Sequence, residues 1–192
     1  MTTAAHQNDV GRLCESANHL PKRLRRLDVP HAADHAIYFL TVCTAHRAKL
    51  LANTETHEQF LAFCHRSPEL AGVWVGRYVL MPDHLHVFVS CEGSGALSHW
   101  VSSLKKFLAV HWRKQGGVAP FWQESFFDHR LRNDESYQEK WMYVFENPVR
   151  AGLTKEASRW VFAGEVHPIE LGEDQRRADS QSRPTLRIGA KS

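Results

Sequence analysis

Two strand-like segments separated by a short turn restrict the fold of this chain more than any other feature. Residues 73–82 (VWVGRYVLMP) and residues 84–90 (HLHVFVS) are rich in the β-branched and aromatic side chains that are typical of β-strands. Pro82 and Asp83 lie at the junction and favour a turn. A parallel pair of strands needs a crossover connection of about a dozen residues or more, so these two strands are predicted to pair antiparallel.

The remaining pattern places this pair in an α+β fold. Residues 92–95 are predicted to form a loop, and Pro148 is expected to close the last helix. The resulting order β-α-β-β-α-β-α favours a ferredoxin-like, or RRM-like, antiparallel sheet with helices on one face. The other predicted strands are 35–44 and 124–132, and the predicted helices are 53–67, 96–115 and 135–147.

Length and composition indicate one domain of an ordinary globular protein. The chain has 192 residues, of which 43% are hydrophobic, and no apolar run approaches the roughly 20 residues that span a bilayer. Residues 1–20 are predicted to be a flexible tail, residues 21–168 the domain, and residues 169–192 a disordered tail. The four cysteines form no CxxC pair, so a reducing cytoplasm is the expected location, with no membrane association.

The second strand of the pair carries two histidines on one face. Side chains alternate between the faces of a strand, so His84 and His86 share a face with Phe88, while the intervening apolar residues pack on the other. The two imidazoles therefore lie close enough together to chelate one metal ion. A pair of solvent-exposed or hydrogen-bonded histidines is the alternative interpretation, and the motif by itself does not exclude it.

The last predicted helix supplies a phenol and an amide. Tyr143 and Asn147 are four residues apart, which places them on the same face of a helix about one turn from each other. The amide oxygen of Asn147 could complete a metal site with the two histidines. A half-buried tyrosine and an asparagine at a helix end remain the alternatives for these residues.

Taken together, three segments resemble the single-tyrosine HUH transposases, and among them the REP-associated tyrosine transposases. These segments are MPDHLHVFV, FWQESFFDHRLRNDES and YVFENPVRAGL. HUH denotes His-hydrophobic-His, which corresponds to His84-Leu85-His86 in this chain. The resemblance runs from about residue 21 to about Trp160 and implies the HUH endonuclease fold, with the histidine strand central in the sheet.

The resemblance also implies roles for individual residues. Tyr143 matches the nucleophile, and His84, His86 and Asn147 match the ligands of a divalent ion, Mg²⁺ or Mn²⁺. Tyr137 is a rival that lacks an amide four residues later. The implied reaction cleaves and rejoins single-stranded DNA at REP-type hairpins through a 5′-phosphotyrosine intermediate. The expected enzyme is a monomer or a homodimer associated with the bacterial nucleoid.

Basic and aromatic residues are expected to line the path of the DNA. The net charge is only +3, so their distribution matters more than their total. Phosphate neutralisation would make binding salt-dependent, and aromatic rings could stack on unpaired bases. Solvated surface side chains are the alternative for each residue. The candidates are Lys22, Arg23, Arg25, Arg26, Lys105, Lys106, Trp112, Arg113 and Lys114, with His111 and Trp122 as further stacking candidates.

Three other functions are alternatives to the transposase interpretation. Histidine-triad nucleotide hydrolases carry a third histidine two residues after the pair, and Phe88 at that position excludes them. A metal hydrolase that activates water would leave Tyr143 dispensable. A binding module derived from a transposase would recognise hairpin DNA without cutting it.

Overall fold

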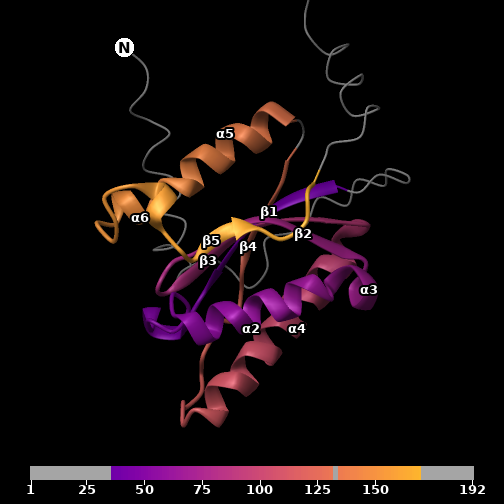
Figure 1. The fold of residues 1–192 in the computed structure, drawn as a ribbon. Coiled ribbons are helices and arrows are strands. Elements are labelled where there is room, and N and C mark those ends of the chain that lie inside the picture. The colour runs from indigo at the N-terminus through magenta and orange to yellow at the C-terminus, as the bar shows by residue number, and fades with distance from the viewer. Residues whose placement is uncertain (1–35, 132–133, 170–192) are drawn as a thin grey trace, which may run out of the picture.

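The computed structural model describes residues 36–131 and 134–169 of the chain. They form one sheet with helices on both of its faces (Figure 1). The predicted tail at 1–20 and the basic segment that follows it lie outside the described residues, as does the chain from residue 170. In chain order the elements are β1 (Ala36–Cys43), η2 (Ala45–Arg47), α2 (Thr54–His65), α3 (Ser67–Ala71), β2 (Val73–Leu80), β3 (His84–Cys91), α4 (Gly93–Lys114), β4 (Phe127–Arg130), α5 (Asp134–Phe145), α6 (Asn147–Arg150), η3 (Ala157–Arg159) and β5 (Ala163–Glu165).

The sheet has the strand order β4-β1-β3-β2-β5, and every neighbouring pair is antiparallel. The first four strands in this order form the ferredoxin-like arrangement, so the predicted α+β class and the antiparallel sheet are confirmed. β3 lies at the centre, where Thr41 of β1 is opposite His86. β5 pairs with the outer edge of β2, a strand that the patternless sequence after Trp160 did not predict.

Helices cover both faces of the sheet because the central strand is apolar on both sides. The buried side chains of Leu85, Val87 and Val89 belong to the apolar cluster that α2 and α4 cover. This is the one face on which the helices were predicted to pack. Phe88 belongs to a second cluster, on the opposite face, with Tyr137 and Val144 of α5. α5 therefore lies on the opposite face of the sheet from α2 and α4, which corrects the prediction that all helices cover one face (Figure 1).

Two predicted boundaries also differ from the structure. The segment 92–95 is not a loop, because α4 already begins at Gly93. The last helix does not continue to Asn147: α5 ends at Phe145, and Asn147 opens the short helix α6 with Pro148 in its first turn. A proline is tolerated in a first turn because the backbone N–H that it lacks would have no partner within the helix.

Candidate functional site

The two histidines lie on the face of the sheet that α5 covers. The centroids of the His84 and His86 rings are 4.7 Å apart, and the rings meet edge to face. His86 is buried, with 2% of its surface exposed, and stacks on Phe39 of β1 at a centroid distance of 5.5 Å. The predicted alternation of the strand is confirmed, and the site lies between sheet and helix instead of on an open face.

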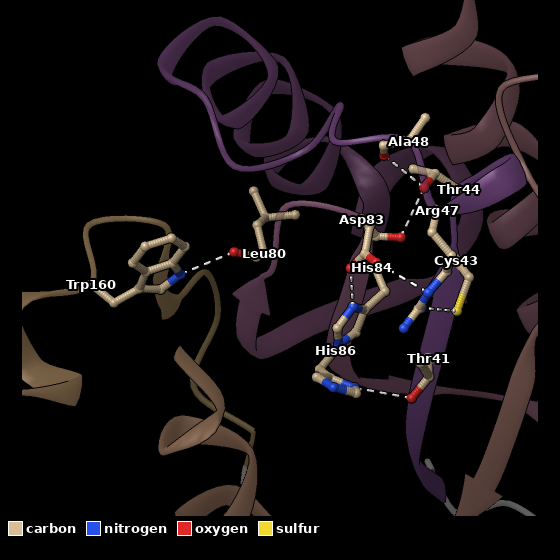
Figure 2. Close-up of polar contacts among 10 residues, drawn as sticks. All are labelled: Thr41, Cys43, Thr44, Arg47, Ala48, Leu80, Asp83, His84, His86 and Trp160. Carbon is tan, nitrogen blue, oxygen red and sulfur yellow. Dashed lines mark hydrogen bonds and ion pairs between the residues drawn. The ribbon is translucent and has the colours of Figure 1, made fainter. Parts of the chain in front are cut away.

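Each imidazole is held by a neighbouring side chain at its Nδ1 atom, as Figure 2 shows. His84 Nδ1 lies 2.6 Å from Asp83 Oδ1, and His86 Nδ1 lies 3.0 Å from Thr41 Oγ1. An ionised carboxylate can only accept a hydrogen bond, so Asp83 favours the His84 tautomer with its proton on Nδ1. Nε2 is then the nitrogen with the lone pair that a metal ion requires, and Thr41 Oγ1 can accept from His86 in the same way.

Asp83 is held in turn by Arg47, whose Nε lies 3.1 Å from Asp83 Oδ2. Partial burial alone would raise the pKa of the Asp83 carboxyl. The hydrogen bond from His84 and the electrostatic interactions with His84 and Arg47 together outweigh that effect, so the pKa of Asp83 is lowered. The carboxylate therefore stays ionised at neutral pH and fixes the His84 ring.

Arg47 reaches this position from an unusual turn between β1 and α2. His46 and Arg47 both have positive φ angles, 51° and 56°, in the left-handed region that side chains other than glycine rarely adopt. The preceding Thr44 ties the turn to the β2–β3 connection, because its backbone N–H and its Oγ1 both donate to Asp83 O, at 3.0 Å and 2.9 Å. Strained backbone of this kind is frequent at functional sites.

His86 is kept neutral by its surroundings. Burial lowers the pKa of His86 well below its usual value, and the positive charges of His84, Arg150, Lys140 and Arg47 lower it further. A neutral imidazole retains the lone pair with which it can bind a metal ion. The charges that act on this ring come from the β1–α2 turn, from α5 and from α6.

Tyr143 and Asn147 belong to consecutive helices and are linked by Arg150. Tyr143 packs against the apolar cluster on the α5 face of the sheet, which is the face that carries the histidine pair. The Arg150 guanidinium lies 4.0 Å from the centroid of the Tyr143 ring and donates to the Tyr143 carbonyl and to Asn147 Oδ1. Asn147 Nδ2 is buried without a hydrogen-bond partner.

The rival tyrosine is in a different environment. Tyr137 is 2% exposed, and its ring meets Phe88 edge to face in the core between α5 and the sheet. The Tyr137 ring thus packs in the apolar cluster between α5 and the sheet. Tyr143, on the same helix, is only partly buried.

The donor atoms fit a divalent metal ion only if the amide takes part. Among the described residues, no three His, Cys, Asp or Glu side chains gather closely enough to hold a metal ion. The donors that the family resemblance implies are the Nε2 atoms of His84 and His86 and the amide oxygen of Asn147. Imidazole suits Mn²⁺ and Zn²⁺ well, whereas Mg²⁺ prefers oxygen, so this set does not by itself select the ion. Asn147 Oδ1 accepts a hydrogen bond from Arg150, and the oxygen of an amide has a second lone pair that a metal ion could use.

The basic and aromatic residues predicted to contact DNA on α4 belong to a helix that lies on the opposite side of the sheet from α5 (Figure 1). Trp112 is 3% exposed and donates its indole N–H to Thr56 Oγ1, so the prediction that it binds DNA is wrong. Trp122 packs on Trp112, and its indole N–H donates to Lys105 O. The exposed residues are Lys106, Arg113 and Lys114, whereas His111 is half-buried.

Lys105 has a structural role in the same region. Its ammonium donates to the carbonyls of Gln123, Glu124 and Ser125, and burial lowers its pKa to about 8. The side chain thus anchors the segment that leads into β4. The predicted basic arm (Lys22, Arg23, Arg25 and Arg26) lies outside the part of the chain that the structure describes.

Several residues of the site were not predicted from the sequence. The sequence predicts Asp83 only as part of a turn, although a carboxylate directly before the histidine pair could have indicated a residue that orients a metal-binding histidine. Arg150 follows Asn147 by three residues, which is a spacing at which helical side chains meet. Arg47 and Lys140 carried no such signal, because they reach the site only through the tertiary fold.

Comparison with known proteins identifies the class to which this arrangement belongs. The family described as "Transposase IS200 like" matches residues 32–143, which is more than half of the chain. The chain therefore belongs to the IS200-like transposase family.

Two relatives agree with the resemblance inferred from the motifs. A REP-associated tyrosine transposase of Escherichia coli (strain K12) is 29% identical over 109 residues, which cover 52% of this chain and 63% of that protein. The chain thus matches less than two thirds of this relative's length. A solved structure of a REP-associated tyrosine transposase bound to a REP hairpin has a TM-score of 0.59 and 21% sequence identity, and the match covers 79% of this chain and 97% of that chain. At this identity the likeness supports the fold alone.

Within residues 36–131 and 134–169, no helix combines the length and the apolar character that crossing a membrane requires.

Proposed function

We propose that this protein is a metal-dependent transposase that cleaves and rejoins single-stranded DNA at REP-type hairpins. The observation that supports the proposal most is the packing of α5 on the sheet face that carries His84 and His86. This packing brings Tyr143 and Asn147 to the side of the sheet where the two imidazoles lie. Membership of the IS200-like transposase family supports the same reaction class.

In the proposed reaction Tyr143 is the nucleophile. Its phenol oxygen forms a bond to the scissile phosphorus, the bond from phosphorus to the 3′ oxygen breaks, and the phenol proton ends on that oxygen. The 5′ end of the DNA is then joined to Tyr143, and attack by a 3′-hydroxyl reverses the step and rejoins a strand. Arg150, which lies over the Tyr143 ring, holds the phenol in place on α5.

His84, His86 and Asn147 would hold the divalent ion. When bound, the ion neutralises charge on the scissile phosphate and orients it for attack. Asp83 and Thr41 engage Nδ1 of the two imidazoles, so Nε2 is the nitrogen that each ring would offer to the ion. DNA in the bacterial cytoplasm is the proposed substrate, with the protein acting as a monomer or a homodimer.

The experiment combines the full chain with a labelled REP-type hairpin oligonucleotide and Mg²⁺ or Mn²⁺. A covalent protein–DNA adduct that survives denaturing electrophoresis is expected for the unmodified protein, but not for Tyr143→Phe. Tyr137→Phe is the matched control, since it removes a phenol from the same helix, and it should still form the adduct.

Two other outcomes would replace the proposal. Nicking that persists in Tyr143→Phe would indicate a hydrolase that activates water at the histidine pair. Hairpin binding without an adduct under either metal would indicate a binding module derived from a transposase.

A further inference from the structure

Three cations surround the histidine pair, and they come from three different elements. Arg47 belongs to η2, Lys140 to α5 and Arg150 to α6. None of them was a candidate for DNA contact in the sequence. The proposed function does not specify which face of the sheet the DNA strand crosses, and the positions of these three cations bear on that question.

A chain of contacts runs from Arg47 through the histidines to Lys140. Arg47 Nε lies 3.1 Å from the carboxylate of Asp83, which lies 2.6 Å from His84. The His84 ring meets His86 at 4.7 Å, and His86 stacks on Phe39 at 5.5 Å. Lys140 Nζ then lies 5.3 Å from the centroid of the Phe39 ring. The histidine pair therefore lies between Arg47 and Lys140 in this series of contacts.

Arg150 adds a third charge, on the side of the nucleophile. Its guanidinium lies 4.0 Å from the centroid of the Tyr143 ring, and its side chain is exposed. Three cationic side chains near one site favour the binding of a polyanion, although the Asp83 carboxylate offsets part of the charge of Arg47.

We infer that Arg47, Lys140 and Arg150 bind the phosphates that flank the scissile phosphate, so that the DNA strand crosses the α5 face of the sheet. The inference rests on the proposed function, because it assigns a path to the strand that Tyr143 would attack. Guanidinium and ammonium groups form charge-assisted hydrogen bonds with phosphate oxygens. The basic side chains of α4 lie on the opposite face and do not take part.

The test measures the binding of a short, fluorescently labelled single-stranded DNA to the full chain in EDTA, where no cleavage occurs. Fluorescence anisotropy is recorded between about 50 and 200 mM salt, because the slope of log affinity against log salt counts the phosphates contacted. Lys140→Gln is the main variant, and Arg150→Gln is the second. Lys140→Arg retains the charge. Lys106→Gln and Lys114→Gln are matched controls on the exposed side of α4.

The inference predicts a distinct pattern among these variants. Lys140→Gln and Arg150→Gln should each reduce the slope by about 0.7, the value for one lost contact to single-stranded DNA, and weaken binding several-fold at low salt. Lys140→Arg and both α4 variants should bind as the unmodified protein does. Circular dichroism melting curves establish that each variant is folded, and Lys140→Gln alone carries the test if Arg150→Gln is unstable.

Two results would overturn the inference in different ways. Unchanged slopes in the Lys140 and Arg150 variants, with loss of binding in the α4 variants, would place the strand on the other face and leave the proposed function intact. Failure of the unmodified protein to bind single-stranded DNA would overturn the proposed function itself.

Discussion

Asp83 Oδ1 lies 2.6 Å from His84 Nδ1, while its other carboxylate oxygen lies 3.1 Å from Arg47 Nε. This one carboxylate therefore joins the turn after β1 to the first histidine of the proposed metal site. Residues that orient a metal-binding histidine influence metal affinity without touching the metal. The relationship leads directly to a prediction.

Replacing Asp83 with asparagine should weaken metal binding. An amide can accept a hydrogen bond from Nδ1–H or donate one to Nδ1, so the His84 tautomer is no longer fixed. We expect the affinity for Mn²⁺ to fall about 10- to 100-fold in isothermal titration calorimetry. Glu156→Gln is the control, because Glu156 forms an exposed ion pair with Arg159. Equal Mn²⁺ affinity in Asp83→Asn and the unmodified protein would contradict the role of Asp83.

Replacing Trp112 with alanine should affect stability and not recognition of DNA. Trp112 is 3% exposed, and its ring packs on Phe121 and Trp122 at centroid distances of 5.5 and 5.1 Å. Removing so large a buried side chain should lower the free energy of unfolding by about 3–5 kcal/mol, as urea titration would measure. Val118→Ala, at a residue 87% exposed, should have little effect. Weaker DNA binding with unchanged stability would contradict the buried position.

Lys105 should make stability depend on pH in an alkaline window. Burial lowers its pKa from 10.5 to about 8 in the folded protein, so between these values the unfolded chain binds more protons than the folded one. The free energy of unfolding should therefore rise with pH across this window, relative to Lys105→Met. Urea titrations of both proteins from about pH 7 to about pH 10 measure the difference.

The control for this measurement is Lys106→Met, which removes an exposed lysine from the same helix. A stability difference between Lys105→Met and the unmodified protein that stays constant over the pH range would contradict the prediction.

Gly152 follows the end of α6 by two residues and has a backbone conformation that other residues rarely adopt. Its φ angle is +69°, and a side chain there is strained even though a Cβ atom would meet nothing within 4 Å. Gly152→Ala should lower the free energy of unfolding by about 1–2 kcal/mol in urea titration. Gly95→Ala is the matched control, because Gly95 lies within α4, has open space around it and needs no positive φ angle. Its substitution should be neutral or slightly stabilising, since alanine favours helices. Equal effects of the two substitutions would contradict the prediction.

The sequence alone was sufficient for the features that depend on near neighbours in the chain. The turn at Pro82-Asp83 and the alternation through His84 and His86 defined an antiparallel hairpin with both imidazoles on one side. The spacing of Tyr143 and Asn147 predicted one helical face for both, but the helix is interrupted between them, and Arg150 contacts each of the two residues. These relationships follow from the alternation of side chains along a strand and from their regular spacing on a helix, both of which depend only on residues close together in the sequence.

Only the tertiary structure decided which distant side chains gather around the histidines. Arg47, Lys140 and Arg150 stand far from residues 84–86 in the sequence, and their closeness depends on the packing of a turn and two helices against the sheet. Trp112 illustrates the same limit: an aromatic residue on an amphipathic helix suits a core or a DNA surface equally well. The physical reason is that a buried apolar face determines where a helix packs, while the sequence pattern does not specify which face of the sheet it will cover.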